Sequence, residues 1–157
     1  MRYVAFMRHG EPQGREDGSG LTETGKTQAD AMGNYIRSMA GNDACVMASP
    51  VERARQTAER VANALGCGFK TRHYLADGTP EIEAYEALMK DMKANPVDCF
   101  IAVSHKVTCM ALSFMYAREI GAKGIAALAA GLDTGQAYFF DLQKKTVKIF
   151  PDYGRLQ

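Results

Sequence analysis

Short apolar runs alternate with longer amphipathic segments along most of this chain, and this alternation restricts its fold more than any other feature. Short apolar runs are typical of strands, and segments with apolar residues three and four apart are typical of helices. The expected strands cover 2–8, 43–49, 68–75 and 97–104, and the expected helices cover 22–39, 51–65, 81–94 and 106–119. This order predicts a mainly parallel sheet with helices on both faces, a three-layer α/β/α fold.

The end of the chain follows a different pattern. Two runs rich in β-branched and aromatic residues, 136–142 and 146–150, are separated by Gln143-Lys144-Lys145 and predict an antiparallel hairpin. The segment from Gly121 to Gly135 stays open, because residues 125–130 suit a helix while the surrounding glycines favour a loop. We therefore expect a parallel sheet with an antiparallel C-terminal element.

Length and charge narrow the classes of function. The 157 residues fit one domain, which we place at 1–157. The 19 Lys and Arg against 18 Asp and Glu give a net charge of +1, which argues against a nucleic-acid partner. The apolar run at residues 3–7 is too short for a signal peptide, and no stretch approaches the ~20 apolar residues that span a bilayer. We expect a cytoplasmic protein with its four cysteines reduced and no membrane partner.

Two of the three histidines directly follow predicted strands. His9 comes after the first strand and His105 after the fourth, and loops at the carboxyl ends of parallel strands line the ligand crevice of such sheets. Either histidine alone is equally well explained as a hydrogen-bonded side chain at a strand end. Their shared position predicts that they meet. His73 lies at the edge of the third predicted strand, where a structural or solvent-facing role is expected.

Cationic and flexible residues accompany these histidines. Arg8 precedes His9, and a guanidinium held there matches two oxygens of a phosphate. Gly10 allows the backbone to approach an anion closely. Arg53 lies near the start of the second predicted helix, where N–H groups and the helix dipole favour anions. For the later arginines of that helix a solvated surface is the simpler interpretation. The pattern indicates a pocket for a phosphoryl group.

A general acid for the leaving group is the missing element. Asp77 follows the third predicted strand and has the right position, although an Asp before Gly78 is also a common turn residue. Glu81 and Glu83 are rivals. Glu81 is equally explained by a helix start in which Thr79 caps the helix and Glu81 complements the dipole.

Four motifs in one order resemble a known family. They are Arg8-His9-Gly10, Leu21-Thr22-Glu23-Thr24-Gly25 followed by Gln28-Ala29, the run from Ser49-Pro50-Val51-Glu52-Arg53 to Ala58, and Ser104-His105. Together they resemble the histidine phosphatase superfamily, also called phosphoglycerate mutase-like, over residues 2 to about 113. The short chain is most similar to the compact branch that includes bacterial phosphohistidine phosphatases.

The resemblance implies a set of roles. His9 would be the nucleophile that becomes phosphohistidine, Arg8, Arg53 and His105 would bind the phosphoryl oxygens, and no metal or other cofactor is implied. The substrate would be a phosphorylated small molecule or a phosphoprotein. Where the family usually has leucine, any residue and glutamate, this chain has Leu75-Ala76-Asp77, so the acid is one methylene shorter or lies elsewhere. An imidazole leaving group needs an acid less than an alkoxide does, which favours phosphohistidine as substrate.

Three other functions fit parts of the pattern. A phosphoglycerate mutase-type phosphotransferase would use the same residues but needs a covered pocket. A non-catalytic module that binds phosphorylated ligands would be expected to lack one histidine or Arg53, and all are present. A metal site built from His9, Glu11 and His105 has no third dependable ligand in the pattern. The sequence pattern favours a phosphatase over these three alternatives.

Overall fold

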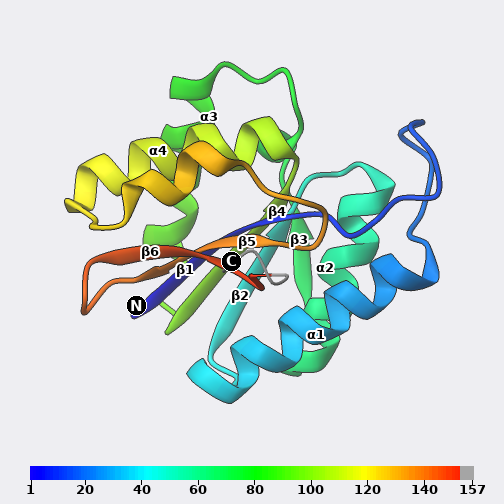
Figure 1. Cartoon of the computed structure of the whole chain (residues 1–157), viewed down its shortest axis with the longest axis horizontal. Helices are drawn as coiled ribbons and strands as arrows, with labels where there is room; N and C mark the ends of the chain where they lie inside the picture. The colour runs from blue at the N-terminus through cyan, green and yellow to red at the C-terminus, as the bar shows by residue number, and fades with distance from the viewer. Residues whose placement is uncertain (153–157) are drawn as a thin grey trace.

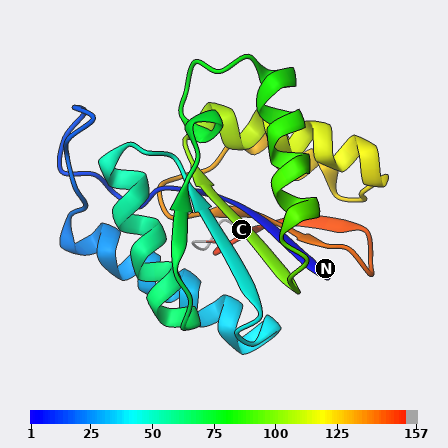
Figure 2. The same cartoon turned by 180° about the vertical axis from the view of Figure 1, so that it is seen from behind.

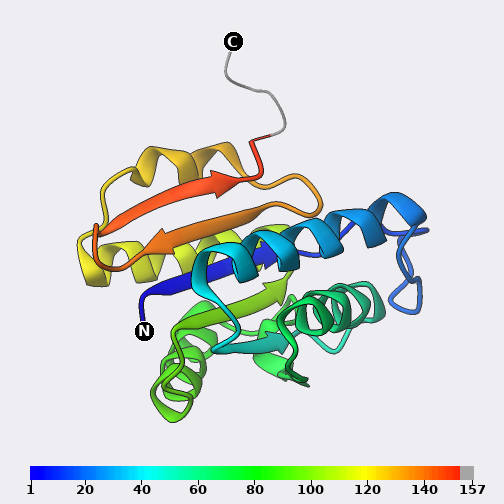
Figure 3. The same cartoon turned by 90° about the horizontal axis from the view of Figure 1, so that it is seen from below.

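The structure, a computed structural model that describes residues 1–152, has the predicted three-layer α/β/α architecture. Its six strands lie in the order β3-β2-β4-β1-β5-β6. Strands β1 (Tyr3–Arg8), β2 (Ala44–Ala48), β3 (Phe69–Thr71) and β4 (Cys99–Ser104) run parallel. Strand β5 (Ala137–Asp141) pairs antiparallel with β1, and β6 (Thr146–Phe150) pairs antiparallel with β5. Figure 2 shows β3 beside β2, and Figure 3 shows the β5–β6 hairpin on the other side of β1.

Helices cover both faces of this sheet (Figure 1). Helices α1 (Glu23–Ala40) and α2 (Glu52–Leu65) pack on one face. Helices α3 (Glu81–Ala94) and α4 (Lys106–Ile120) and the 3₁₀ helix η2 (Ile125–Ala130) pack on the other. Alternate residues of each central strand point to opposite faces: Ala5 and Met7 of β1 join the first core, and Val4 and Phe6 join the second. Burial on both faces explains why these strands read as continuous apolar runs.

The predicted third strand, 68–75, is only partly a strand. β3 ends at Thr71, and His73–Leu75 form a 3₁₀ helix, η1. The backbone N–H of Arg72 makes a last hydrogen bond to the Ala48 carbonyl, 2.7 Å, and the chain then turns so that Leu75 is fully buried. His73 is exposed on η1, which agrees with its expected solvent-facing position.

The predicted N-terminus of α3 is correct, but its cap is not. Pro80 occupies the N-cap position, and no side chain caps the helix. Thr79, the expected cap, lies one residue too early, and proline provides the fixed φ that suits a helix start. By contrast, Thr22 caps α1 by accepting a hydrogen bond from the Gly25 N–H, 3.0 Å. The open segment contains η2 and leads into β5.

Candidate functional site

His9 and His105 meet at the carboxyl edge of the sheet. Strands β1 and β4 pair in parallel with Arg8 opposite Ser104, so the next residue of each strand leaves the sheet at the same level. The His9 N–H donates to the Ser104 carbonyl, 3.0 Å. The two rings lie edge to face with centroids 5.4 Å apart, and the residues are only 5% and 4% exposed. The topology thus brings together two side chains that are almost a hundred residues apart.

One ring nitrogen of His9 is oriented by its neighbour in the chain. Nδ1 lies 2.8 Å from the Gly10 carbonyl oxygen, and a carbonyl only accepts, so Nδ1 carries the proton. Nε2 then carries the lone pair. The Nε–H of Arg53 donates to this Nε2 at 3.2 Å. The imidazole therefore presents its basic nitrogen to the second arginine of the site.

The surroundings of His9 keep it neutral. Burial lowers its pKa from 6.5 to about 4, and electrostatic interactions with His105 and with the guanidinium groups of Arg53 and Arg8 act in the same direction. The hydrogen bond to the Gly10 carbonyl raises the pKa and offsets part of this effect. At neutral pH the side chain is a neutral imidazole in a positively charged setting, the state that a nitrogen nucleophile requires.

Gly10 also has a structural role. Its N–H donates to Thr57 Oγ1 at 2.9 Å, and Thr57 in turn donates to the Arg53 carbonyl at 2.7 Å. A Cβ at Gly10 would lie 2.6 Å from the Gly25 carbonyl oxygen. Glycine is needed here because the loop after β1 passes directly over the first turn of α1. The contacts fix His9 against both α1 and α2.

Arg8 is held by a segment distant in the sequence. Its NH1 donates to the Leu132 carbonyl at 2.8 Å, and its buried Nε has no hydrogen-bond partner within residues 1–152. The Gly135 N–H also donates to the His9 carbonyl at 2.9 Å. The stretch after η2, whose structure the sequence left open, thus positions both residues of the Arg8-His9 pair.

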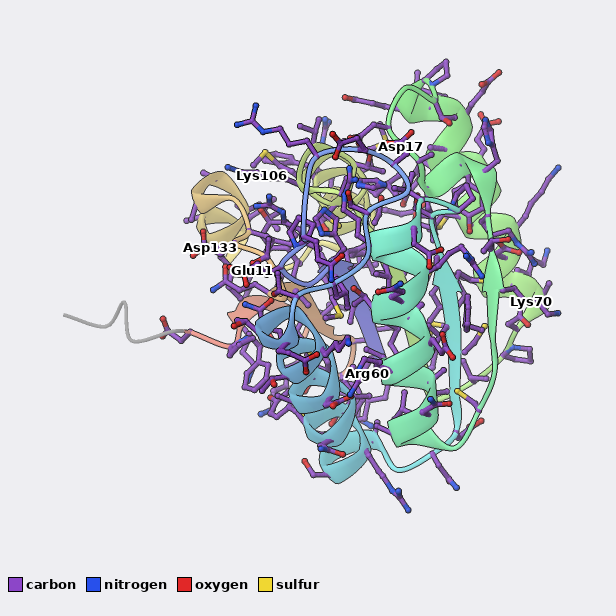
Figure 4. The ribbon with its side chains drawn as sticks, turned by 90° about the vertical axis from the view of Figure 1, so that its right-hand side faces the viewer. Glu11, Asp17, Arg60, Lys70, Lys106 and Asp133 are labelled. Atoms are coloured by element: carbon purple, nitrogen blue, oxygen red, sulfur yellow. The ribbon has the colours of Figure 1, made fainter. Side chains whose placement is uncertain are left out.

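Arg53 is the one arginine of α2 that contacts a site histidine. It lies in the first turn, and its NH1 donates to the Glu16 carbonyl at 3.4 Å besides the bond from Nε to His9. Arg55 instead pairs with Glu52 on the surface. Arg60 makes two bonds to Asp30 of α1, 2.9 and 2.7 Å, and Figure 4 shows it between the two helices, away from the loops at the carboxyl edge.

His105 is oriented by Ser49, the residue that directly follows β2. Its Nε2 lies 2.9 Å from Ser49 Oγ, which also accepts the Val51 N–H at 3.3 Å. The Nδ1 atom is buried and lacks a hydrogen-bond partner in the part of the chain that the structure describes. Burial lowers the pKa of His105, and nearby Asp77 raises it more than any other charge does. Three parallel strands, β1, β2 and β4, therefore each supply a side chain to the site.

Asp77 and Glu81 line one hollow beside the start of α4. The Thr108 hydroxyl, in the first turn of α4, donates to Asp77 Oδ1 at 2.7 Å, and the Asp77 carboxylate raises the pKa of His105. Glu81 is exposed at the start of α3 and lines a hollow with Val107 and Thr108. Glu83, two residues after Glu81 in α3, is also exposed. Of the three candidate acids, Asp77 has a contact that fixes its carboxyl group.

Charged residues of both signs surround the site. Figure 4 looks onto the carboxyl edge, where Glu11 and Asp17 of the loop after β1, Lys106 of α4 and Asp133 lie around the central side chains. Arg8, Arg53 and His105 have no carboxylate partner among residues 1–152. Fixed N–H donors beside a neutral imidazole suit a tetrahedral group whose oxygens carry negative charge.

Within residues 1–152, no three His, Cys, Asp or Glu side chains are grouped so that they would hold a metal ion. The same residues contain no helix with the length and apolar character of a membrane span.

Four supporting residues were not found by sequence reasoning. Ser49, Thr57, Thr108 and the Leu132 carbonyl each hold one site residue in place. Ser49 belongs to the motif around Arg53, so its place after a strand was a usable signal. The other three act through contacts between distant segments, and their residue types are common on helices and loops.

Comparison with known proteins assigns the chain to a family. Residues 4–100, more than half of the chain, match the histidine phosphatase superfamily (branch 1). The chain belongs to this superfamily, which confirms the resemblance seen in the four motifs. No curated protein sequence gives a significant match.

Solved structures with the same fold include phosphatases. A candidate phosphohistidine phosphatase SixA from Agrobacterium tumefaciens has a TM-score of 0.66 and 21% identity over 89% of this chain and 91% of that one. The protein histidine phosphatase SixA complexed with tungstate has a TM-score of 0.64 and 19% identity, covering 94% of this chain and 93% of that one. A mycobacterial glucosyl-3-phosphoglycerate phosphatase complexed with VO3 has a TM-score of 0.67 and 16% identity, covering 95% of this chain and 96% of that one. At these identities the likeness establishes the shared fold.

Proposed function

We propose that this protein is a metal-independent phosphatase that hydrolyses a phosphomonoester or a phosphohistidine through a phosphorylated His9. The observation that carries the proposal is the state of His9: a buried, neutral imidazole whose Nδ1 proton is held by Gly10 and whose Nε2 lone pair faces Arg53. Membership of the histidine phosphatase superfamily supports the same chemistry.

In the first step Nε2 of His9 attacks phosphorus in line with the leaving group. The guanidinium of Arg53 moves from Nε2 to a phosphoryl oxygen, and Arg8 and the Nδ1–H of His105 bind the other oxygens. Ser49 supports this donor role, because its hydroxyl hydrogen can point to His105 Nε2 while Nδ1 keeps its proton. An N–P bond forms as the bond from phosphorus to the leaving oxygen or nitrogen breaks.

Asp77 is the proposed acid for the departing group. Thr108 donates to Oδ1, so the transferable proton sits on Oδ2 and passes to the leaving oxygen or nitrogen. In the second step the Asp77 carboxylate accepts a proton from water while the water oxygen attacks phosphorus. The N–P bond breaks, phosphate leaves, and neutral His9 returns with its Nδ1 proton unchanged. Positioned acids of this kind contribute about 10²- to 10⁴-fold in rate.

The cationic side chains replace the charge that a metal ion would supply. As the transition state spreads negative charge over three equatorial oxygens, fixed donors stabilise it without reorganising. Loss of one such donor lowers kcat by about 10²- to 10³-fold in other enzymes. We therefore expect Arg53→Ala to reduce turnover by this amount.

A test uses p-nitrophenyl phosphate with purified protein treated with a chelator. We expect turnover by the wild type, none by His9→Ala, and a fall of about 10²- to 10³-fold in Arg53→Ala. Arg55→Ala is the matched control, because Arg55 lies on the same helix turn but pairs with Glu52 on the surface. Equal turnover by His9→Ala and the wild type would overturn the proposal, and so would a strict requirement for added metal.

A substrate panel separates the two leaving-group classes. Phosphohistidine protein, sugar phosphates, phosphoglycerate and phosphopeptides are compared at equal concentration through kcat/KM. Transfer of phosphate to a second acceptor, rather than release into water, would indicate the phosphotransferase alternative. Binding without turnover on every member would indicate the non-catalytic module.

A further inference from the structure

Helix α4 is apolar on both of its faces. Cys109, Leu112 and Tyr116 are buried against the sheet. On the opposite side a stripe of Val107, Met110, Ala111, Phe114 and Met115 reaches the surface at helical spacing, and we call it the α4 stripe. Val107 is 68% exposed and Phe114 44%. A surface helix normally presents charged or polar residues on its solvent side, so this face is built to be covered.

The α4 stripe forms one wall of a groove that begins at the proposed active site. Two adjoining hollows of about 410 and 420 Å³ share Val107, Ala111 and Glu81. One extends along the stripe to Arg118. The other reaches Asp77 and Thr108, the proposed acid and its donor. A molecule lying in the groove therefore has one end at the proton donor.

Helix α3 adds a charge to this surface. Glu81, the first residue of α3, lines both hollows. Glu81 lies at the α3 side of the groove and Arg118 at its far end, so the apolar surface is bounded by one charge of each sign. An apolar strip edged by charged residues is typical of a protein-binding groove.

The length and position of the groove select its occupant. Eleven residues separate Val107 from Arg118, which corresponds to about 16 Å along the helix. A small leaving group that starts at Asp77 would leave most of this stripe uncovered. A second copy of the chain seated here would cover Asp77 and close the entrance to substrate. A protein substrate covers the stripe and delivers its phosphorylated side chain to the site at the same time.

We propose that the α4 stripe docks an amphipathic helix of a phosphoprotein substrate, with the phosphorylated side chain at the end of that helix nearest Asp77. This inference rests on the proposed phosphatase function and adds the substrate class. The apolar residues of the partner helix contact Val107, Met110 and Phe114, and its phosphoryl group reaches His9. The docking contacts lower KM for the protein substrate and are absent for a small aryl phosphate.

Two synthetic helical peptides test the docking. Both carry one phosphohistidine near one end; one has leucines 3, 4, 7 and 11 positions further on, and the other has the same composition with the leucines moved to other faces. In the wild type we expect kcat/KM to be at least about tenfold higher for the first peptide, which corresponds to about 1.4 kcal/mol. Phe114→Glu should remove that preference and change turnover of p-nitrophenyl phosphate less than about twofold.

Controls separate docking from folding and from chemistry. Ala31→Glu introduces the same charge at an exposed position of α1, on the other face of the sheet, and should keep the peptide preference. Phe114→Ser is a milder variant if Phe114→Glu folds poorly by circular dichroism. Binding of the unphosphorylated leucine peptide, followed by fluorescence anisotropy, reports docking even if the proposed chemistry fails.

Several results would overturn the docking proposal while leaving the phosphatase intact. One is equal kcat/KM for the two peptides together with normal p-nitrophenyl phosphate turnover. Another is an unchanged preference in both Phe114 variants. A concentration-dependent dimer that Phe114→Glu abolishes, without peptide binding by anisotropy, would assign the stripe to a second copy of the chain.

Discussion

The depressed pKa of His9 makes the stability of the fold depend on pH. Folded His9 has a pKa of about 4, against 6.5 for an ordinary histidine, because it is buried and lies beside His105 and the cationic Arg53 and Arg8. The unfolded chain therefore binds a proton more readily than the folded one in this range. The stability contribution of neutral His9 is complete above about pH 6.5, is lost as the pH falls, and reaches its full loss near pH 4.

The size of this effect follows from the shift. Between pH 7 and pH 5, linkage with pKa values of 6.5 and about 4 gives a loss of about 2 kcal/mol in the free energy of unfolding. Urea unfolding of the wild type and His9→Gln at both pH values isolates the contribution of His9 to this loss, because the other groups titrate in both proteins. We expect the wild type to lose about 2 kcal/mol more than His9→Gln over this interval.

The exposed His73 provides the matched control, because His73→Gln also removes one histidine from the chain. His73→Gln should lose as much stability as the wild type between pH 7 and pH 5. Equal losses in the wild type and His9→Gln would refute the reasoning about His9. A nuclear magnetic resonance titration of the His9 ring gives the folded pKa directly, and a value near 6.5 would also refute this reasoning.

Three further results are expected. Because His9 is about nine-tenths neutral at pH 5, compared with about 3% for a pKa of 6.5, the acid limb of kcat/KM should not follow a group of pKa 6.5; a limb centred there contradicts the assignment. Gly10→Ala should reduce the free energy of unfolding by about 1–3 kcal/mol in urea, because the new Cβ meets a backbone carbonyl at 2.6 Å, whereas Gly18→Ala, with no atom within 4 Å, should have little effect; equal values would argue against the close contact. Thr108→Val frees Asp77 and should slow alkyl phosphates about tenfold while aryl phosphates, with their better leaving groups, change less; a uniform change would show that Thr108 does not act through the acid.

The strand-end histidines show what sequence reasoning captures well. His9 and His105 follow apolar runs that are buried on both faces, and parallel pairing of such strands puts their ends at one edge. The same reasoning fails for residues 72–75. These residues directly continue β3 in the sequence, but Arg72 pairs with Asp91 at 2.9 Å, the Leu75 carbonyl accepts the Ser104 hydroxyl and the Leu75 side chain is buried. These interactions come from other elements, so local pattern does not reveal them.

The contacts that support the site residues are harder still to predict from the sequence. The sequence predicts that Arg8 binds a phosphate, but not that an NH1 hydrogen bond to the Leu132 carbonyl, 124 positions away, holds the guanidinium in place. It predicts that Gly10 admits an anion, but not that the backbone of α1 also leaves no room for a Cβ there. In both cases the residue type was informative, while the partner that explains it became visible only when the elements were packed.

The most direct test of the proposed phosphatase is the detection of phosphate on His9. The wild type is mixed with a ³²P-labelled phosphate ester, quenched within the first turnover, and analysed for label that is stable in base and labile in acid, as expected for phosphohistidine. Peptide mapping should place this label on the peptide that contains His9, and His9→Ala should carry none. Label on another residue, or turnover without any labelled protein under single-turnover conditions, would contradict the account.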